Sequence, residues 1–160
     1  MPKVGTQVDI LQRINQLEEQ VALLRRTGRT VDEVPFWPVN FNGLAYEDDT
    51  TWSNMWETTL TPRTASLEMG MLFVGDQVGG VNTGGEWQIL LDSSTVAASG
   101  TVPATYTYAS PTASIDLTPY RGAAQLQVRI QVRRTAGATT GGKFGGGGSI
   151  GASIRYARLL

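Results

Sequence analysis

The chain of 160 residues contains neither cysteine nor histidine. Without cysteine it has no disulfides and no thiolate ligands for a metal. Without histidine it lacks the commonest general base and the commonest metal ligand in proteins. Lysine is scarce as well, because Lys3 and Lys143 are the only two. No serine has a histidine partner that would activate it as a nucleophile, so we expect no enzyme activity, no cofactor and no bound metal.

Long apolar runs are missing too, and no membrane span or signal peptide is visible in the sequence. The formal net charge is −1, which gives no general attraction to nucleic acids or membranes. The charge is nevertheless uneven, since residues 93–160 carry seven basic side chains and one acidic one. We expect regions of opposite charge to complement each other within an oligomer. A basic surface that faces an acidic partner is the alternative.

Residues 6–27 contain a heptad repeat, because apolar residues recur at alternating spacings of four and three. The apolar seam consists of Ile10, Ile14, Leu17, Val21 and Leu24. Thr6 and Asp9 form a start that resembles a capping box, and Gly28 follows the last turn as a stop. A helix of this length is marginal when it is alone in water. The seam therefore predicts association with further copies of the same helix.

The side chains beside the seam suggest how many copies associate. Arg13 precedes Ile14, and Glu18 follows Leu17, in a pattern that resembles the short trimerisation signature of parallel coiled coils. The arginine stem can cover the seam while its guanidinium pairs with a neighbouring glutamate. Branched residues at a with leucine at d favour a dimer instead. We expect a homotrimer, and its predicted interface consists of Ile10, Arg13, Ile14, Leu17, Glu18, Val21 and Leu24. A dimer and a helix packed on its own domain are the alternatives.

A connector at residues 30–43 follows the helix. Pro35 and Pro38 flank Phe36 and Trp37. Each proline lacks a backbone donor and pushes the preceding residue toward an extended conformation. We therefore expect a stiff, extended neck whose two aromatic side chains fold back onto the base of the next domain. An exposed aromatic docking site is the alternative.

From residue 44 to residue 160 the pattern is that of β-strands. Apolar and polar residues alternate most clearly from Leu126 to Arg133, and a second run alternates from Trp52 to Leu60. Glycine and proline turns separate the runs, and no helical periodicity is present. The spacing predicts a mainly β domain, an antiparallel two-sheet sandwich of the jelly-roll type. The expected order is a parallel trimeric coiled-coil helix (1–29), a Pro-rich extended neck (30–43) and the sandwich (44–160).

Two motifs in this region suggest small ligands. The segment from Gly137 to Lys143 matches most of a phosphate-binding loop. However, Phe144 stands where serine or threonine would bind magnesium, and glycines follow where a helix should begin. We interpret this segment as a long hairpin loop. The run Glu47-Asp48-Asp49 offers oxygen ligands for calcium, but its spacing matches no calcium loop and favours a solvated turn.

Aromatic residues provide the best candidates for a binding surface. Tyr46 and Trp52 are the candidate glycan contacts, because aromatic rings give large and rigid contact area. Trp56 and Trp87 share strand sides with apolar residues, which indicates that they belong to the core. The basic residues on the strand at 126–134 alternate with glutamine rather than with aromatics. We therefore expect no nucleic-acid binding at this strand.

A coiled coil that leads through a Pro-rich neck into a sandwich is the plan of viral fibre and spike proteins. The residues that carry the resemblance are Leu11 to Leu24, Thr51-Trp52, Trp56 to Thr58, Ile115 to Leu117 and Leu126 to Arg129. On these residues the chain resembles small minor tail proteins or fibres of tailed phages that infect actinobacteria. The resemblance implies a structural virion protein that assembles in the host cytoplasm.

On this interpretation the protein is a trimeric tail-tip or minor tail fibre that attaches to the baseplate and contacts the host surface through the sandwich. A trimeric capsid decoration or head-fibre protein, bound to the capsid, is the first alternative. A carbohydrate-binding module that recognises cell-wall glycan is the second. The expected partners are other copies of the chain, other virion proteins and a glycan of the host surface, without membrane insertion.

Overall fold

The structure is a computed structural model, and it describes residues 12–21, 32–39, 50–137 and 153–160. The chain divides into two units, Met1–Val31 and Asp32–Leu160. In the first unit residues 12–21 form an α-helix whose side chains are all exposed. This N-terminal helix lies within the segment predicted to be helical. Its predicted trimeric coiled coil needs several chains, so it stays a prediction.

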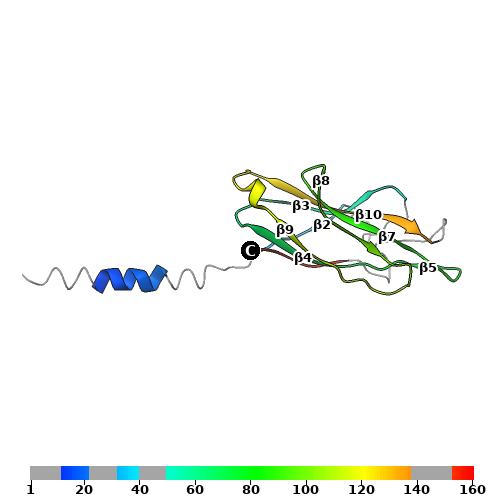
Figure 1. The fold of residues 1–160 in the computed structure, drawn as a ribbon, viewed down its shortest axis with the longest axis horizontal. Coiled ribbons are helices and arrows are strands. Elements are labelled where there is room, and N and C mark those ends of the chain that lie inside the picture. Colours follow the sequence, from blue (N-terminus) through cyan, green and yellow to red (C-terminus); the bar gives the residue numbers. More distant parts are fainter. Residues whose placement is uncertain (1–11, 22–31, 40–49, 138–152) are drawn as a thin grey trace, which may run out of the picture. The chain divides into compact units, whose positions relative to one another are not determined.

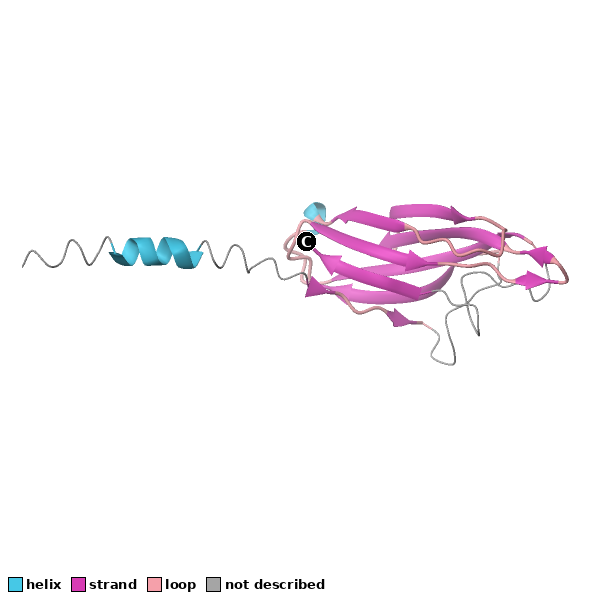
Figure 2. Cartoon of the chain, turned by 90° about the horizontal axis from the view of Figure 1, so that it is seen from below, coloured by secondary structure: helices cyan, strands magenta, loops and turns pink. Residues whose placement is uncertain are grey.

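The second unit consists of β-strands and one short 3-10 turn (Figure 1). The described strands are β1 (Asp32–Glu33), β2 (Trp37–Pro38), β3 (Ser53–Leu60), β4 (Ser66–Leu72), β5 (Gln77–Val78), β6 (Val81–Asn82), β7 (Gly84–Leu91), β8 (Thr95–Val102), β9 (Thr112–Asp116), β10 (Leu126–Ala136) and β11 (Ser153–Leu159), and the turn η1 is Thr118–Tyr120. They form a four-stranded sheet β1-β11-β4-β9, a five-stranded sheet β2-β3-β10-β7-β8 and a small ribbon β5-β6 (Figure 2). The predicted mainly β class with two antiparallel sheets is confirmed.

The order of pairing follows that of a jelly roll. β7 pairs with β8, β4 with β9, β3 with β10, and β1 with β11, so the pairs are nested around the β7–β8 hairpin. Such nesting arises when one long antiparallel hairpin folds across two sheets. β10 also pairs with β7, and β11 with β4, which joins the nested pairs into the two sheets. Two packed antiparallel sheets with this connectivity correspond to the predicted jelly-roll type.

The hydrophobic core lies between the two sheets. Every second residue of β10 is buried from its start onward, and the inward side chains are Leu126, Val128, Ile130 and Val132. β4 supplies the facing layer with Leu67, Met69 and Met71, which are also fully buried. Because the side chains of a strand alternate between its two faces, every second side chain lies in the core and the others lie at the surface.

Phe73 is the largest fully buried side chain, and it lies between two tryptophans. Its ring centroid is 6.3 Å from that of Trp56 and 6.2 Å from that of Trp87. Both tryptophans are buried, which confirms the prediction that they belong to the core. The aromatic cluster joins β3 and β7 of one sheet to the end of β4 in the other.

Residues 32–39, part of the predicted neck, are extended and already paired into the sandwich. β1 lies at one edge of the four-stranded sheet, and β2 lies at one edge of the five-stranded sheet. Phe36 packs against the core, whereas Trp37 is 60% exposed and does not fold back as expected. Pro38 lies on the edge strand β2, where a missing backbone donor is tolerated and hinders pairing with another edge.

The end of β9 is fixed by a short polar turn. The carboxylate of Asp116 accepts a hydrogen bond from the backbone N–H of Thr118 at 2.8 Å. Hydrogen bonds from the side chain and the backbone of Thr118 lower the pKa of Asp116 below its usual value. The carboxylate thus helps the chain to turn from β9 into η1.

Candidate functional site

The outer face of the five-stranded sheet carries polar side chains in register. Asn54 of β3, Gln131 of β10, Gln88 of β7 and Ser99 of β8 stand opposite one another across four strands. Residues that are directly opposite in antiparallel strands share a face of the sheet. None of the four is buried. They therefore form a polar row on the side of the sheet that faces away from the core.

Three amide side chains of this row are joined by hydrogen bonds. The Gln88 Nε2 donates to the Gln131 Oε1 at 2.6 Å, and the Gln131 Nε2 donates to the Asn54 Oδ1 at 2.8 Å. Each bond joins the nitrogen of one amide to the oxygen of the next. The side chain of Gln88 is consequently held in one orientation on a face where a long polar side chain would otherwise sample several.

A charged row lies next to the amide row. The Arg133 Nε donates to the Glu86 Oε2 at 2.7 Å, and the second nitrogen Nη2 of Arg133 lies 2.6 Å from the same oxygen. The guanidinium carbon of Arg133 also lies 4.6 Å from the ring centroid of Trp52, within the range of a cation–π contact. Arg133 therefore positions two neighbours at once, an aromatic ring and a carboxylate.

The position of Trp52 depends on a β-bulge. The register of β3 on β10 shifts between Ile130 and Gln131, so that Trp56 stands opposite Ile130 while Asn54 stands opposite Gln131. Met55 and Trp56 are consequently buried although they are consecutive residues. A bulge inserts one residue and exchanges the two faces of the strand beyond it. Strict alternation from Trp52 to Leu60 would place Trp52 on the core side, but the bulge places it on the outer face.

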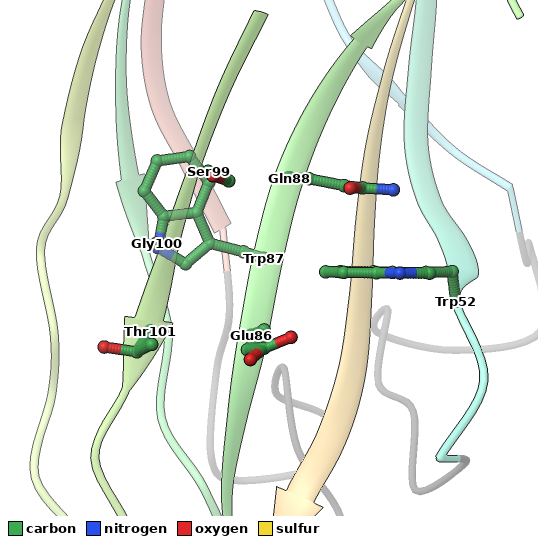
Figure 3. A pocket seen from close by; sticks show the side chains of 7 residues that line it. All are labelled: Trp52, Glu86, Trp87, Gln88, Ser99, Gly100 and Thr101. Atoms are coloured by element: carbon green, nitrogen blue, oxygen red, sulfur yellow. The ribbon is translucent and has the colours of Figure 1, made fainter. Parts of the chain in front are cut away.

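These rows border a groove with a volume of about 240 Å³. Its lining consists of Trp52, Glu86, Trp87, Gln88, Ser99, Gly100 and Thr101. Figure 3 shows the Trp52 ring extending from the start of β3 across β10 toward β7, while Ser99, Gly100 and Thr101 belong to β8. The groove is open to solvent and lies near the edge strand β8.

Most of the groove's polar groups have binding capacity left. Within the described part of the chain, no residue bonds to the Glu86 Oε1, because both contacts of Arg133 use Oε2. The Gln88 carbonyl oxygen is also without a protein donor there, because its bond to Gln131 uses the nitrogen. Ser99 and Thr101 add hydroxyl groups at positions opposite Gln88 and Glu86. The groove therefore presents acceptors and hydroxyls next to an aromatic wall.

Gly100 allows the edge strand to lie against a buried indole. A Cβ atom at this position would lie 2.8 Å from two ring carbons of Trp87. We predict that Gly100→Val lowers the free energy of unfolding by about 1–3 kcal/mol, since overpacking forces side chains and backbone to shift. The measurement is urea unfolding of the full chain, with Ser99→Val as the matched control on the outward side of β8. Equal stability of the Gly100 variant and the wild type would contradict this close packing.

The predicted site residues are distributed between the two units. Trp52 lies in the groove, with the guanidinium of Arg133 over its ring. Tyr46, the other candidate glycan contact, lies outside the described residues, as do Glu47-Asp48-Asp49 and most of the glycine-rich loop. Among the trimer candidates, Ile10 and Leu24 also lie outside them. The remaining candidates are Arg13, Ile14, Leu17, Glu18 and Val21, which lie on the N-terminal helix and are exposed.

The uneven charge of the chain is compensated in part within a single molecule. Glu86 and Glu57 come from the acidic first part of the sequence, and Arg133 and Arg129 come from the basic second part. They pair across neighbouring strands, Arg133 with Glu86 at 2.6 Å and Arg129 with Glu57 at 3.8 Å. These four charges therefore compensate one another within one chain, and no second copy is needed for them. Pairing between strands that are distant in the sequence is sufficient to bring them together.

Sequence reasoning missed the polar side of the groove. Glu86 and Gln88 alternate with buried apolar residues on β7, and this alternation is the signal of an outward face. Nothing in the sequence indicates that Arg133 of β10 stands beside Glu86, because the two are 47 residues apart. The groove emerges only once the register of β3, β10, β7 and β8 is known.

In the described ranges, no three acidic side chains gather closely enough to hold a metal ion. The helix described there is too short and too polar to cross a membrane. Comparison with protein-family models, with curated proteins and with solved structures gives no significant match.

Proposed function

We propose that the chain is a structural protein of a tailed-phage particle, a homotrimer whose N-terminal helices hold three jelly-roll domains together as a tail-tip or minor tail fibre. The observation that carries this proposal is the exposed seam of the N-terminal helix. Ile14, Leu17 and Val21 are 45%, 59% and 45% exposed. Apolar side chains at a and d positions stabilise a helix in water when other helices cover them.

The residues that flank the seam support three copies rather than two. Arg13 and Glu18 lie on the same described helix and are exposed, so both are accessible to a neighbouring chain. In a parallel trimer the arginine of one chain pairs with the glutamate of the next, and its methylene groups cover the seam. The protein is on this proposal structural and non-catalytic, and it assembles in the host cytoplasm before it joins the virion.

The jelly roll agrees with this role by analogy of fold, because viral structural proteins and lectins both use double-sheet jelly rolls. The helix seam and the jelly roll would suit a capsid decoration or head-fibre protein equally well. Such a protein would bind the capsid instead of the baseplate. Immunogold labelling of particles with an antibody to the chain separates the two, since the label marks either the tail tip or the head.

A carbohydrate-binding module for cell-wall glycan is a second candidate function. The observation in its favour is the position of Trp52, a predicted glycan contact, in a groove lined by polar side chains. The two functions are compatible, since a fibre head that contacts a cell surface needs a binding site. In that arrangement three copies of the groove would act together, which raises the avidity for a repetitive surface.

We expect sedimentation equilibrium of the full chain at about 10 µM to give the mass of three chains, because interhelical burial and multiple contacts favour assembly at such concentrations. Arg13→Ala combined with Glu18→Ala should raise the dissociation constant of the trimer, since each copy loses an interchain ion pair. Glu19→Ala, on the outer side of the helix, is the matched control. A monomer at this concentration would contradict the proposed assembly, and an unchanged double variant would contradict the trimerisation signature.

A further inference from the structure

We propose that the groove between Trp52 and β8 binds one uncharged sugar ring. The contacts are the Trp52 indole, the Glu86 carboxylate, the Gln88 amide and the hydroxyls of Ser99 and Thr101. A role of this groove in contacting a host surface rests on the proposed function. The binding of a free sugar does not depend on that function or on trimer formation, because every residue that lines the groove belongs to one chain.

The side chains of the groove are held in place before any ligand arrives. Arg133 contacts both Trp52 and Glu86, at 4.6 Å from the ring centroid and 2.7 Å from the carboxylate oxygen. Gln88 is held by Gln131 through a hydrogen bond of 2.6 Å. Side chains whose orientation is fixed by a second layer of contacts lose little entropy when a ligand binds. Three of the groove's contacts are therefore preorganised.

The hydrogen-bond donors and acceptors of the groove match those of a sugar. A sugar hydroxyl both donates and accepts hydrogen bonds. The Glu86 Oε1, which bonds to no described residue, and the carbonyl oxygen of Gln88 are acceptors, whereas Ser99 and Thr101 can donate as well as accept. Glu86 and Gln88 on β7 stand opposite Thr101 and Ser99 on the neighbouring strand β8. A ring with hydroxyls on successive carbons can reach several of them at once.

The groove combines an apolar wall with a balanced charge. The Trp52 indole lines the groove while Arg133 lies over its ring. Indole atoms that border a groove offer apolar contact area to the C–H groups of a sugar. The charge of Glu86 is compensated by Arg133 at 2.6 Å. The groove consequently has no strong preference for an anion or a cation. An uncharged polyhydroxylated ligand fits this environment.

The size of the groove limits the contact to one ring. Its volume of about 240 Å³ is below the range of roughly 300–1,000 Å³ that is typical of pockets for drug-sized ligands. Because the groove is open, the rest of an oligosaccharide can continue along the surface. A few hydrogen bonds and one aromatic contact give weak binding to each chain, and we expect a Kd of about 1 mM. Such affinity becomes useful when several copies bind together.

The test uses the isotope-labelled full chain, titrated with glucose, galactose and N-acetylglucosamine and with tetrasaccharides of each. We expect at least one of these sugars to shift the indole N–H signal of Trp52 and the side-chain amide signal of Gln88 in a saturable manner. Trp52→Ala removes the apolar wall, and Ser99→Tyr fills the groove from an exposed position while retaining the other contacts. Each should weaken binding at least tenfold.

Trp37→Ala is the matched control, because Trp37 is an exposed tryptophan opposite Glu57, outside the groove lining. It should leave the Kd unchanged. Absence of a shift with all of these sugars would overturn the inference, and so would an equal loss of binding in the Trp37 variant. Sedimentation of each sample separates this result from the proposed function. A trimer that binds no sugar would contradict only the proposed sugar site. A monomer that binds sugar would contradict only the proposed assembly.

Discussion

Leu17→Asp is expected to convert the trimer into monomers at about 10 µM. Leu17 occupies a d position of the heptad and is 59% exposed on the single helix. In a trimer each leucine would be buried against the other two helices, and burying such a side chain contributes about 1.5–3 kcal/mol. The variant also brings three carboxylates together in the seam, where each disfavours the charged form of the others. Sedimentation equilibrium measures the outcome directly.

Gln16→Asp is the matched control for this variant. It adds the same charge one residue away, at a position outside the seam, and should leave the mass at three chains. If Leu17→Asp also kept three chains and an unchanged melting temperature, the seam would not be the interface. If the mass stayed at one chain in the wild type and Leu17→Asp lowered the stability of the jelly roll, the helix would instead pack on its own domain.

The alternation of apolar and polar residues was sufficient to predict the class of the fold. On β10 the predicted and observed buried positions coincide from Leu126 to Val132. This agreement has a physical basis, because a strand with one face in the core must bury every second residue. The short helix at residues 12–21 lies within the segment whose spacing of three and four residues predicted a helix, whereas the coiled coil stays a prediction.

The candidate site was less predictable, because it depends on contacts between distant segments. The bulge near Met55 moves Trp52 to the outer face, and no turn residue marks it in the sequence. Glu86 lies beside Arg133 because β7 and β10 pair in this register. A shift of one residue in either strand would turn its outward polar side chains toward the core. Local pattern therefore identified Trp52 as a candidate but not the groove around it.

Phe73 provides the largest expected effect on the stability of the jelly roll. Its side chain is fully buried between the rings of Trp56 and Trp87, whose centroids lie 6.3 and 6.2 Å away. Its backbone exchanges two hydrogen bonds of 2.8 Å with Ala109, and these remain possible when the side chain is shortened. Truncation at this position therefore removes packing without removing a backbone pairing.

We predict that Phe73→Ala lowers the free energy of unfolding by about 3–5 kcal/mol, the range found when buried aromatic residues are replaced by alanine. A domain of this size is stable by only about 5–15 kcal/mol, so the variant should unfold at much lower urea concentration or at ambient temperature. Leu72→Ala, at the adjacent and only partly buried position, should cost clearly less. A loss below about 1 kcal/mol for Phe73→Ala would contradict its central place in the core. Because the seam and the aromatic cluster belong to different units, a destabilised jelly roll should leave helix association intact, and sedimentation of the same sample tests that independence.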